Sequence, residues 1–171
     1  MAVLNESAAP ALQIGEDPAD TYRKAEIVHG EIVDAASGET TRRLIDGRKY
    51  TIKIRVKAHE DIPLLSVGFD IRTQTGVQVY GYSTGSAGIP EMISSGALKD
   101  YLFSLPAHLN NGSYFLNLGI AEQFSGADDP HHYSIIQFIA DSIVIEGMTK
   151  DLFPGLINMN SEFLGSSNAS Q

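Results

Sequence analysis

Side chains that could bind a sugar recur in the segment VGFDIRTQTGVQVYGYST. Carbohydrate recognition uses aromatic rings against the apolar face of a pyranose, together with planar polar groups that hydrogen-bond its hydroxyls in pairs. The segment predicts a β-hairpin, because apolar residues alternate on both sides of a Gln74-Thr75-Gly76 turn. Its expected outward face carries both kinds of group: Asp70, Arg72, Gln78, Tyr80 and Tyr82.

The face on which these side chains lie depends on the register of the hairpin. If Ile71 pairs with Val79, the two tyrosines point outward, whereas a slip of one residue would bury them. In the first register the face is either a sugar-binding surface or a solvated sheet face with ordinary cross-strand tyrosine pairs. Phe115 and Asn117 would extend the binding surface if their strand is a neighbour in the same sheet.

Other groups of reactive residues give weaker signals. Glu122 and Asp128-Asp129 could hold a calcium ion, although solvated loop charges are the simpler interpretation. His131 and His132 are adjacent, so on a strand they would point to opposite faces and could not share a metal. No carboxyl group lies in an obvious apolar pocket, as a glycosidase acid requires, and no nucleophile-elbow pattern occurs. We therefore expect neither a catalytic residue nor a metal site, and a protein that is not an enzyme.

The composition is that of a globular domain. The chain has 171 residues, 43% of them hydrophobic, which is enough to bury a core. There is no apolar run long enough to span a membrane and no signal-peptide pattern. The absence of cysteine excludes thiolate chemistry and cysteine–zinc sites, and favours a reducing compartment or the periplasm. The formal charge of −9 argues against nucleic-acid binding, and solubility alone accounts for it.

The chain divides into a central domain with a tail at each end. Residues 1–20 read as a linker or disordered tail, which suggests a domain cut from a larger protein whose missing part is N-terminal. Residues 21–147 contain about seven to nine predicted strands, so we expect an all-β fold, an antiparallel immunoglobulin-like β-sandwich. Residues 148–171 form an irregular segment with a disordered end.

Two stretches carry most of this fold prediction. Lys49–His59 alternates strictly between apolar residues and a basic face, which faces water, contacts a partner or protects a sheet edge. The stretch LNNGSY has the spacing of a tyrosine corner between two sheets, in which Gly112 tolerates a positive φ and the Tyr114 hydroxyl returns to the turn backbone. A loop followed by an ordinary strand is the alternative.

The order of these features resembles the C-terminal carbohydrate-binding domain of Wzt-type ATPase subunits, which belong to ABC transporters that export O-antigen polysaccharide. The resemblance covers about Tyr22 to Gly147, and its most specific part is the hairpin followed by L-x-x-G-x-Y. It rests on the segments AEIVHGEIVDAASGE, DGRKYTIKIRV, LLSVGFDIRTQTGVQVYGYST, LNNGSYFLNLGIAE and HHYSIIQFIADSIVIEG.

The resemblance implies a function and a set of partners. In that family the domain forms an immunoglobulin-like sandwich, follows the ATPase domain through a linker, dimerises, and recognises the finished, often end-modified glycan in the cytoplasm. This implies a non-catalytic carbohydrate-binding module at the inner membrane, with lipid-linked O-antigen, a second copy, the ATPase domain and the transmembrane subunit as partners. A structural or protein-interaction sandwich is the alternative function. The family motifs specify neither the sugar nor its linkage nor its cap.

No cofactor is expected for this chain. The pattern G-x-x-x-x-G-K-[ST], whose loop cradles nucleotide phosphates, does not occur in it. ATP would bind the missing N-terminal ATPase domain.

The segment after Gly147 suggests how two copies could be joined. Pro154-Gly155 makes a turn or hinge ahead of the apolar run Leu156 to Met159. A strand beyond a hinge can pair with its own sheet or with that of a partner. We predict that it crosses to the other protomer; folding back locally and staying disordered are the alternatives.

Overall fold

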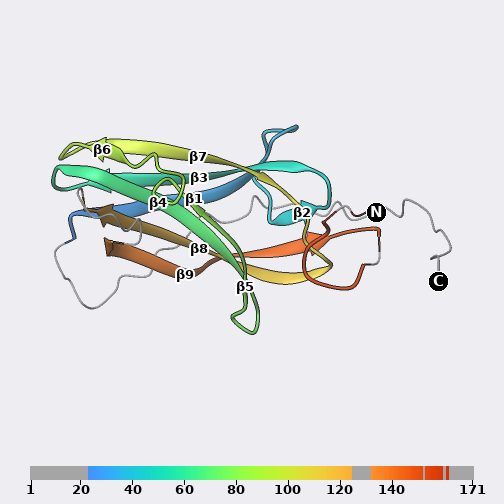
Figure 1. Cartoon of the computed structure of the whole chain (residues 1–171). Helices are drawn as coiled ribbons and strands as arrows, with labels where there is room; N and C mark the ends of the chain where they lie inside the picture. The colour runs from blue at the N-terminus through green and yellow to red at the C-terminus, as the bar shows by residue number, and fades with distance from the viewer. Residues whose placement is uncertain (1–22, 125–131, 152, 160, 162–171) are drawn as a thin grey trace, which may run out of the picture.

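The computed structural model describes residues 23–124, 132–151, 153–159 and 161. Across these residues every helix or strand assigned is a β-strand, and nine strands form two layers (Figure 1). The first layer is an antiparallel three-stranded sheet in the order β1 (Ala25–Asp34), β3 (Lys49–Ala58), β7 (Leu98–Pro106).

The second layer is a six-stranded sheet. Its order is β2 (Arg43–Ile45), β9 (Tyr133–Met148), β8 (Gly112–Gln123), β4 (Ile62–Thr73), β5 (Gln78–Ser83), with β6 (Glu91–Ile93) also paired to β4. All its pairs are antiparallel except that of β2 with β9, which is parallel. The predicted all-β sandwich is confirmed.

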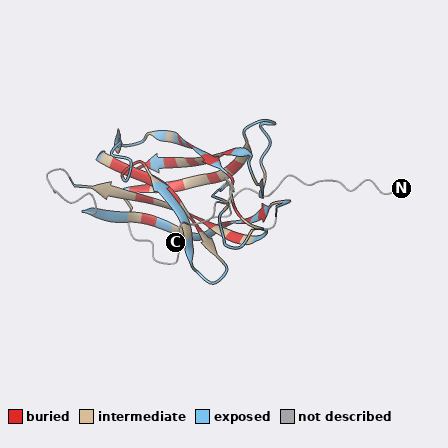
Figure 2. Cartoon of the chain, turned by 45° about the vertical axis from the view of Figure 1, so that its right-hand side comes forward, coloured by how far each residue is buried: buried red, intermediate tan, exposed pale blue. Residues whose placement is uncertain are grey.

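The core lies between the two sheets and follows the alternation of the sequence (Figure 2). In β3 every second residue from Tyr50 to Ala58 is buried, and in β4 the same holds from Leu65 to Ile71. Burying one such side chain contributes about 1.5–3 kcal/mol, so these two strands supply a large part of the stability.

The basic face of β3 is paired with acidic neighbours. β3 is the central strand of its sheet, so the prediction that these charges protect a sheet edge is wrong. Asp100 on β7 accepts hydrogen bonds of 2.6 and 2.9 Å from Arg55, and Lys53 lies 3.5 Å from both Asp100 and Glu31. The three strands thus carry a charge network rather than a bare basic patch.

The predicted tyrosine corner is present where the chain passes from β7 to β8. Tyr114 is buried, and its hydroxyl donates a 3.1 Å hydrogen bond to the carbonyl oxygen of Asn110. Gly112 has a φ of +150°, which is a region that side chains disfavour. Gly147 on β9 faces the corner, and a Cβ there would collide with the Asn110 carbonyl. The corner therefore closes only around two glycines.

The β4–β5 hairpin has a different register from the one we favoured from sequence. Tyr80 pairs with Ile71 and Tyr82 with Phe69, because a β-bulge at Val79 inserts one extra residue after the Arg72–Gln78 pair. Both tyrosines consequently lie on the inner face of the sheet, and their predicted outward placement is wrong. They remain 44% and 41% exposed, because β5 is the end of its sheet, and the ring of Tyr82 meets Phe103 of the edge strand β7 in the other layer.

Candidate functional site

The outer face of the six-stranded sheet carries a groove with a cavity volume of about 560 Å³. Its floor is made of small residues, the cross-strand pairs Gly68–Gly119 and Ser66–Ala121 of β4 and β8. A Cβ at Gly68 would lie 2.6 Å from the carbonyl oxygen of Tyr82, so only glycine lets β5 approach so closely. The absence of large side chains along this floor gives the groove its depth.

One wall of the groove is apolar and comes from β9. Tyr133 and Phe138 are 50% and 47% exposed, and Ile135 is 63% exposed. Ile135 and Phe138 pair with Ala121 and Gly119 of β8, so large side chains stand beside a low floor. Exposed aromatic rings at the side of a groove can stack on the apolar face of a sugar.

The opposite wall is polar and comes from β5 and the loop that follows it. It presents Gln78, Ser83 and Ser86, and the two serines hold each other through reciprocal bonds of 3.0 and 3.1 Å between backbone amides and hydroxyls. The loop is anchored at Thr84, whose amide donates to the Val67 carbonyl and whose hydroxyl accepts from the Val67 amide. This wall is thereby fixed in place.

The loop also closes over the sheet near Ser66. The amide of Gly85 donates a 3.1 Å hydrogen bond to the Ser66 hydroxyl. A Cβ at Gly85 would collide with that hydroxyl and with the side-chain amide of Gln123, both of which line the groove. Glycine at this position therefore lets the loop form one end of the groove.

A chain of hydrogen bonds positions the charged groups of the groove. Arg72 donates to both carboxylate oxygens of Asp70, at 3.0 and 3.2 Å, and Asn117 donates to the same carboxylate at 2.6 Å. Asn117 in turn accepts a 2.7 Å bond from the amide of Asp141, at the point where β9 bends. The Cζ of Arg72 lies 5.9 Å from the centroid of the Phe138 ring. Polar and aromatic groups thus meet at Arg72.

The electrostatics at Arg72 are dominated by neighbouring carboxylates. The hydrogen bond to Asp70 and the charge of that residue raise the pKa of Arg72, and the charge of Asp141 raises it further. The guanidinium is held as a fixed cation with donors left over for a ligand.

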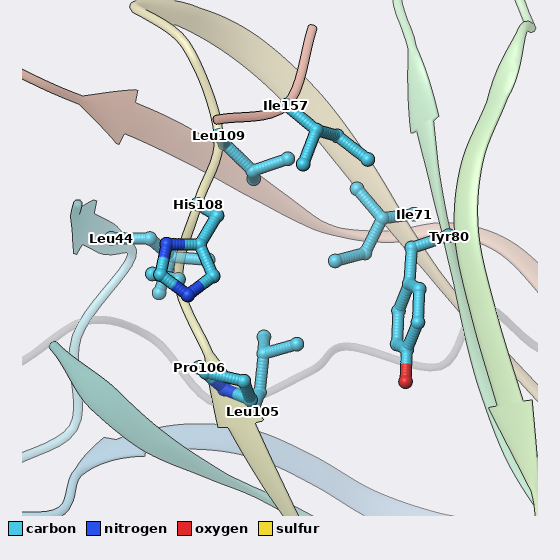
Figure 3. Close-up of a pocket in the computed structure, with 9 residues that line it drawn as sticks. Leu44, Ile71, Tyr80, Leu105, Pro106, His108, Leu109 and Ile157 are labelled. Carbon is cyan, nitrogen blue, oxygen red and sulfur yellow. The ribbon is translucent and has the colours of Figure 1, made fainter. Parts of the chain in front are cut away.

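A second cavity, of about 190 Å³, lies between the sheets beside Tyr80. Figure 3 shows Ile71 and Tyr80 on one side of it and Leu44 and His108 on the other. Its walls are almost entirely carbon. It therefore offers few hydrogen-bonding partners to a sugar, and the groove on the outer face is the better candidate site.

Comparison with known proteins agrees with the fold and with the resemblance. The family model described as the Wzt C-terminal domain matches residues 20–159, which is most of the chain. The chain belongs to this family. A crystal structure of the C-terminal domain of Wzt superposes on the domain with a TM-score of 0.75 at 25% identity, covering 85% of this chain and 86% of that chain.

A second solved structure, a putative β-galactosidase from Bacteroides fragilis, gives a TM-score of 0.39 at 15% identity. It covers 65% of this chain and 15% of that one, and this likeness is too weak to carry an argument. A search of curated proteins gave no match.

This Wzt C-terminal domain brings together only part of the predicted sugar-binding set. Asp70, Arg72 and Gln78 line the groove. Asn117 is 2% exposed and lies beneath it, where it holds Asp70. Phe115 is on the outer face between Arg72 and Val144 but is outside the groove lining.

The two predicted tyrosines make their ring contacts on the inner side of the sheet. The Tyr80 ring lies 6.1 Å from Phe69, and Tyr82 lies edge-on to Phe103 at the same distance. Tyr82 touches the groove, but its ring contact is with the inner layer. The aromatic wall comes from β9 instead.

Sequence reasoning missed Tyr133 and Ile135 because β9 is not regular; it also missed Phe138, although that residue alternates with the inward Ile143 and Ile145. Ile143 and Ile145 face inward, as predicted, and counting back from them by twos would also turn Ile135 inward. Of the two register shifts against β8, the one near Asp141 is by two residues and keeps the parity, whereas the one between Gln137 and Ile135 is by one residue and reverses it. Plain alternation therefore gives the outward face of Phe138 but not that of Tyr133 and Ile135.

Within the one chain described, the C-terminal segment pairs with its own protomer. Ile157 forms an antiparallel bridge with Leu109, and the Asn158 amide donates to the His108 carbonyl at 2.7 Å. Asn158 also donates to Asp46 at 3.2 Å. Exchange of this segment between two protomers stays a prediction.

The other sites considered from sequence lie only in part within the described residues. Asp128, Asp129 and His131 lie outside the described residues, and Glu122 pairs with Lys24 at 2.7 Å. The described part of the chain holds no cluster of three or more potential metal ligands. Nor does it hold a helix of the length and apolarity needed to cross a membrane.

Proposed function

We propose that this domain is a non-catalytic carbohydrate-binding module and that the groove on the outer face of its six-stranded sheet is the binding site. The observation that carries the proposal is the meeting of Phe138 and Tyr133 on one wall with the Asp70–Arg72 pair at the floor. A sugar ring can stack on the aromatic wall while its hydroxyls bond to the planar carboxylate and guanidinium.

The polymer that family membership suggests is a completed, end-modified O-antigen polysaccharide carried on a lipid. The domain would hold this glycan in the cytoplasm beside the inner membrane and couple it to export by an ABC transporter. Its partners would be a second copy, the ATPase domain, which binds ATP, and the transmembrane subunit. A groove open along a sheet face suits a polymer better than an enclosed cavity does.

A second candidate function is protein binding. The exposed apolar side chains of β9, which are Tyr133, Ile135 and Phe138, could contact a protein surface as well as a sugar. Binding of the isolated polysaccharide separates the two functions, because a protein-interaction surface would not bind it.

The test is a titration of the purified domain with the O-polysaccharide of the producing strain, in which calorimetry and NMR measure binding. Arg72→Ala and Phe138→Ala should each weaken binding at least tenfold. Tyr80→Ala, on the other face of the same hairpin, is the matched control and should leave affinity within twofold. A domain that binds no polysaccharide, or an affinity lost only with Tyr80→Ala, would contradict the proposed site.

A further inference from the structure

The charges at the floor of the groove are already compensated by the protein. Among the described residues that line the groove, Asp70 and Arg72 alone carry a formal charge at neutral pH. They form a two-bond ion pair, and the buried amide of Asn117 supplies a third hydrogen bond to the carboxylate. The described lining of the groove therefore holds no cation that lacks a protein counter-charge.

A second carboxylate lies near the same guanidinium. Asp141 is close enough to raise the pKa of Arg72, and its backbone amide is tied to Asn117. One cation thus stands among two anions. An anionic ligand at this place would meet no surplus positive charge, and its desolvation would have no counter-charge to offset it.

The rest of the lining is suited to uncharged groups. Gln78 offers a side-chain amide that can donate to a neutral hydroxyl or accept from one. The hydroxyls of Ser83 and Ser86 are uncharged and donate their own protons within the loop. The β9 wall offers carbon surface. Neither wall favours a carboxylate or phosphate over a hydroxyl.

We propose that the groove selects uncharged glycans and rejects acidic ones, an inference that rests on the proposed carbohydrate-binding function. The Asp70–Arg72 pair acts here as a neutral, planar hydrogen-bonding unit. The groove recognises the hydroxyls and ring faces of the bound polymer. It excludes sugar residues that carry a uronic acid or phosphate group at the point of contact.

The test compares one polymer in two charge states. The O-polysaccharide of the producing strain is titrated before and after TEMPO oxidation of its C6 hydroxyls to carboxylates, and again after reduction of those carboxylates. The unoxidised and the re-reduced polymers should bind at least tenfold more tightly than the oxidised one. Affinity for the unoxidised polymer should change less than threefold between 20 and 500 mM NaCl, because no ion pair with the ligand is formed.

A charge variant separates electrostatic exclusion from steric exclusion. Asp70→Asn leaves Arg72 uncompensated by its bonded partner and should improve binding of the oxidised polymer at least threefold. Asp100→Asn, which changes the net charge equally on the other sheet, should have no such effect.

The failures of the two proposals are distinguishable. Equal or tighter binding of the oxidised polymer, or a native polymer held only through its own acidic groups, would overturn the selection and leave carbohydrate binding intact. If no form of the polymer binds, the proposed function falls and the selection falls with it.

Discussion

The carboxylate of Asp70 and the side-chain amide of Asn117 are joined by a 2.6 Å hydrogen bond between β4 and β8. The bond links a groove residue to one that is buried beneath the sheet face. Asn117 also accepts the amide of Asp141, so a single side chain fixes both the bend of β9 and the orientation of the Asp70–Arg72 pair.

Replacing Asn117 tests this double role. Asn117→Ala leaves the Asp141 amide without its acceptor and should lower the free energy of unfolding by about 1–3 kcal/mol. Glycan affinity should fall as well, since Asp70 loses a donor. Chemical denaturation and calorimetry measure the two effects. Ser134→Ala, at an exposed position on β9, is the control, and an unchanged unfolding midpoint for Asn117→Ala would show that the bond network is not structural.

The tyrosine corner makes a separate prediction about stability. Tyr114→Phe keeps the buried ring and removes the hydroxyl that bonds to Asn110, so unfolding should become easier by about 1–2 kcal/mol. Tyr80→Phe removes a hydroxyl from a half-exposed ring and should change stability by less than about 0.5 kcal/mol. Equal denaturation curves for the two variants would mean that the corner bond contributes nothing.

These residues also show how far the sequence can be read. The strict alternation in β3 and the spacing from Leu109 to Tyr114 are local signals, and the structure confirms both. The two sheets follow from them, because the corner marks where the chain changes layer. The polar half of the groove lies on a regular part of β4, so Asp70 and Arg72 were also predictable.

The aromatic half of the site was not predictable for a physical reason. Each β-bulge reverses the face of every side chain beyond it, and a bulge is set by packing and turn geometry more than by residue type. One bulge at Val79 moved Tyr80 and Tyr82 inward. In β9 the one-residue shift between Gln137 and Ile135 moved Tyr133 and Ile135 outward. Residue type alone therefore indicates which aromatic and polar groups are available but not the face of the sheet on which each ring lies.

Acid should weaken the three-stranded sheet over a defined pH range. The hydrogen bond from Arg55 lowers the pKa of Asp100 from 3.8 to about 2, with the charges of Arg55 and Lys53 acting in the same direction. Because the folded pKa lies below the ordinary value, the stabilisation is fully present above about pH 4 and is lost as the pH falls toward 2.

Denaturation curves between pH 7 and pH 2 measure this effect. Asp100→Asn should flatten the loss of stability below pH 4, whereas Glu39→Gln, on the exposed β1–β2 turn, should retain the slope of the parent. Parallel pH profiles for the parent and Asp100→Asn would exclude Asp100 as a source of the acid sensitivity.

The last prediction concerns assembly through the C-terminal segment. The Ile157–Leu109 bridge holds it to its own chain through two backbone bonds, from Asn158 to the His108 carbonyl and from Asn110 to the Leu156 carbonyl. The side-chain amide of Asn110 adds bonds to the carbonyls of Phe153 and Gly155. Every copy offers the same residues 108–110, and Gly155, with a φ of +117°, follows Pro154 at the turn before the bridge. A different turn there would deliver the same strand to a second protomer without changing the two backbone bonds of the bridge.

Truncation after Lys150 removes the segment and keeps β9 whole. We expect the full chain to scatter light as a dimer at micromolar concentration and the truncated chain as a monomer, or as an aggregate through the uncovered residues 108–110. Ile157→Asp in the full chain, which puts a carboxylate into the apolar cavity that Ile157 lines without shortening the protein, should shift the mass in the same direction. A full-length monomer, or a truncated chain that still dimerises, would show that the segment closes only on its own protomer and that any pairing of copies uses another surface.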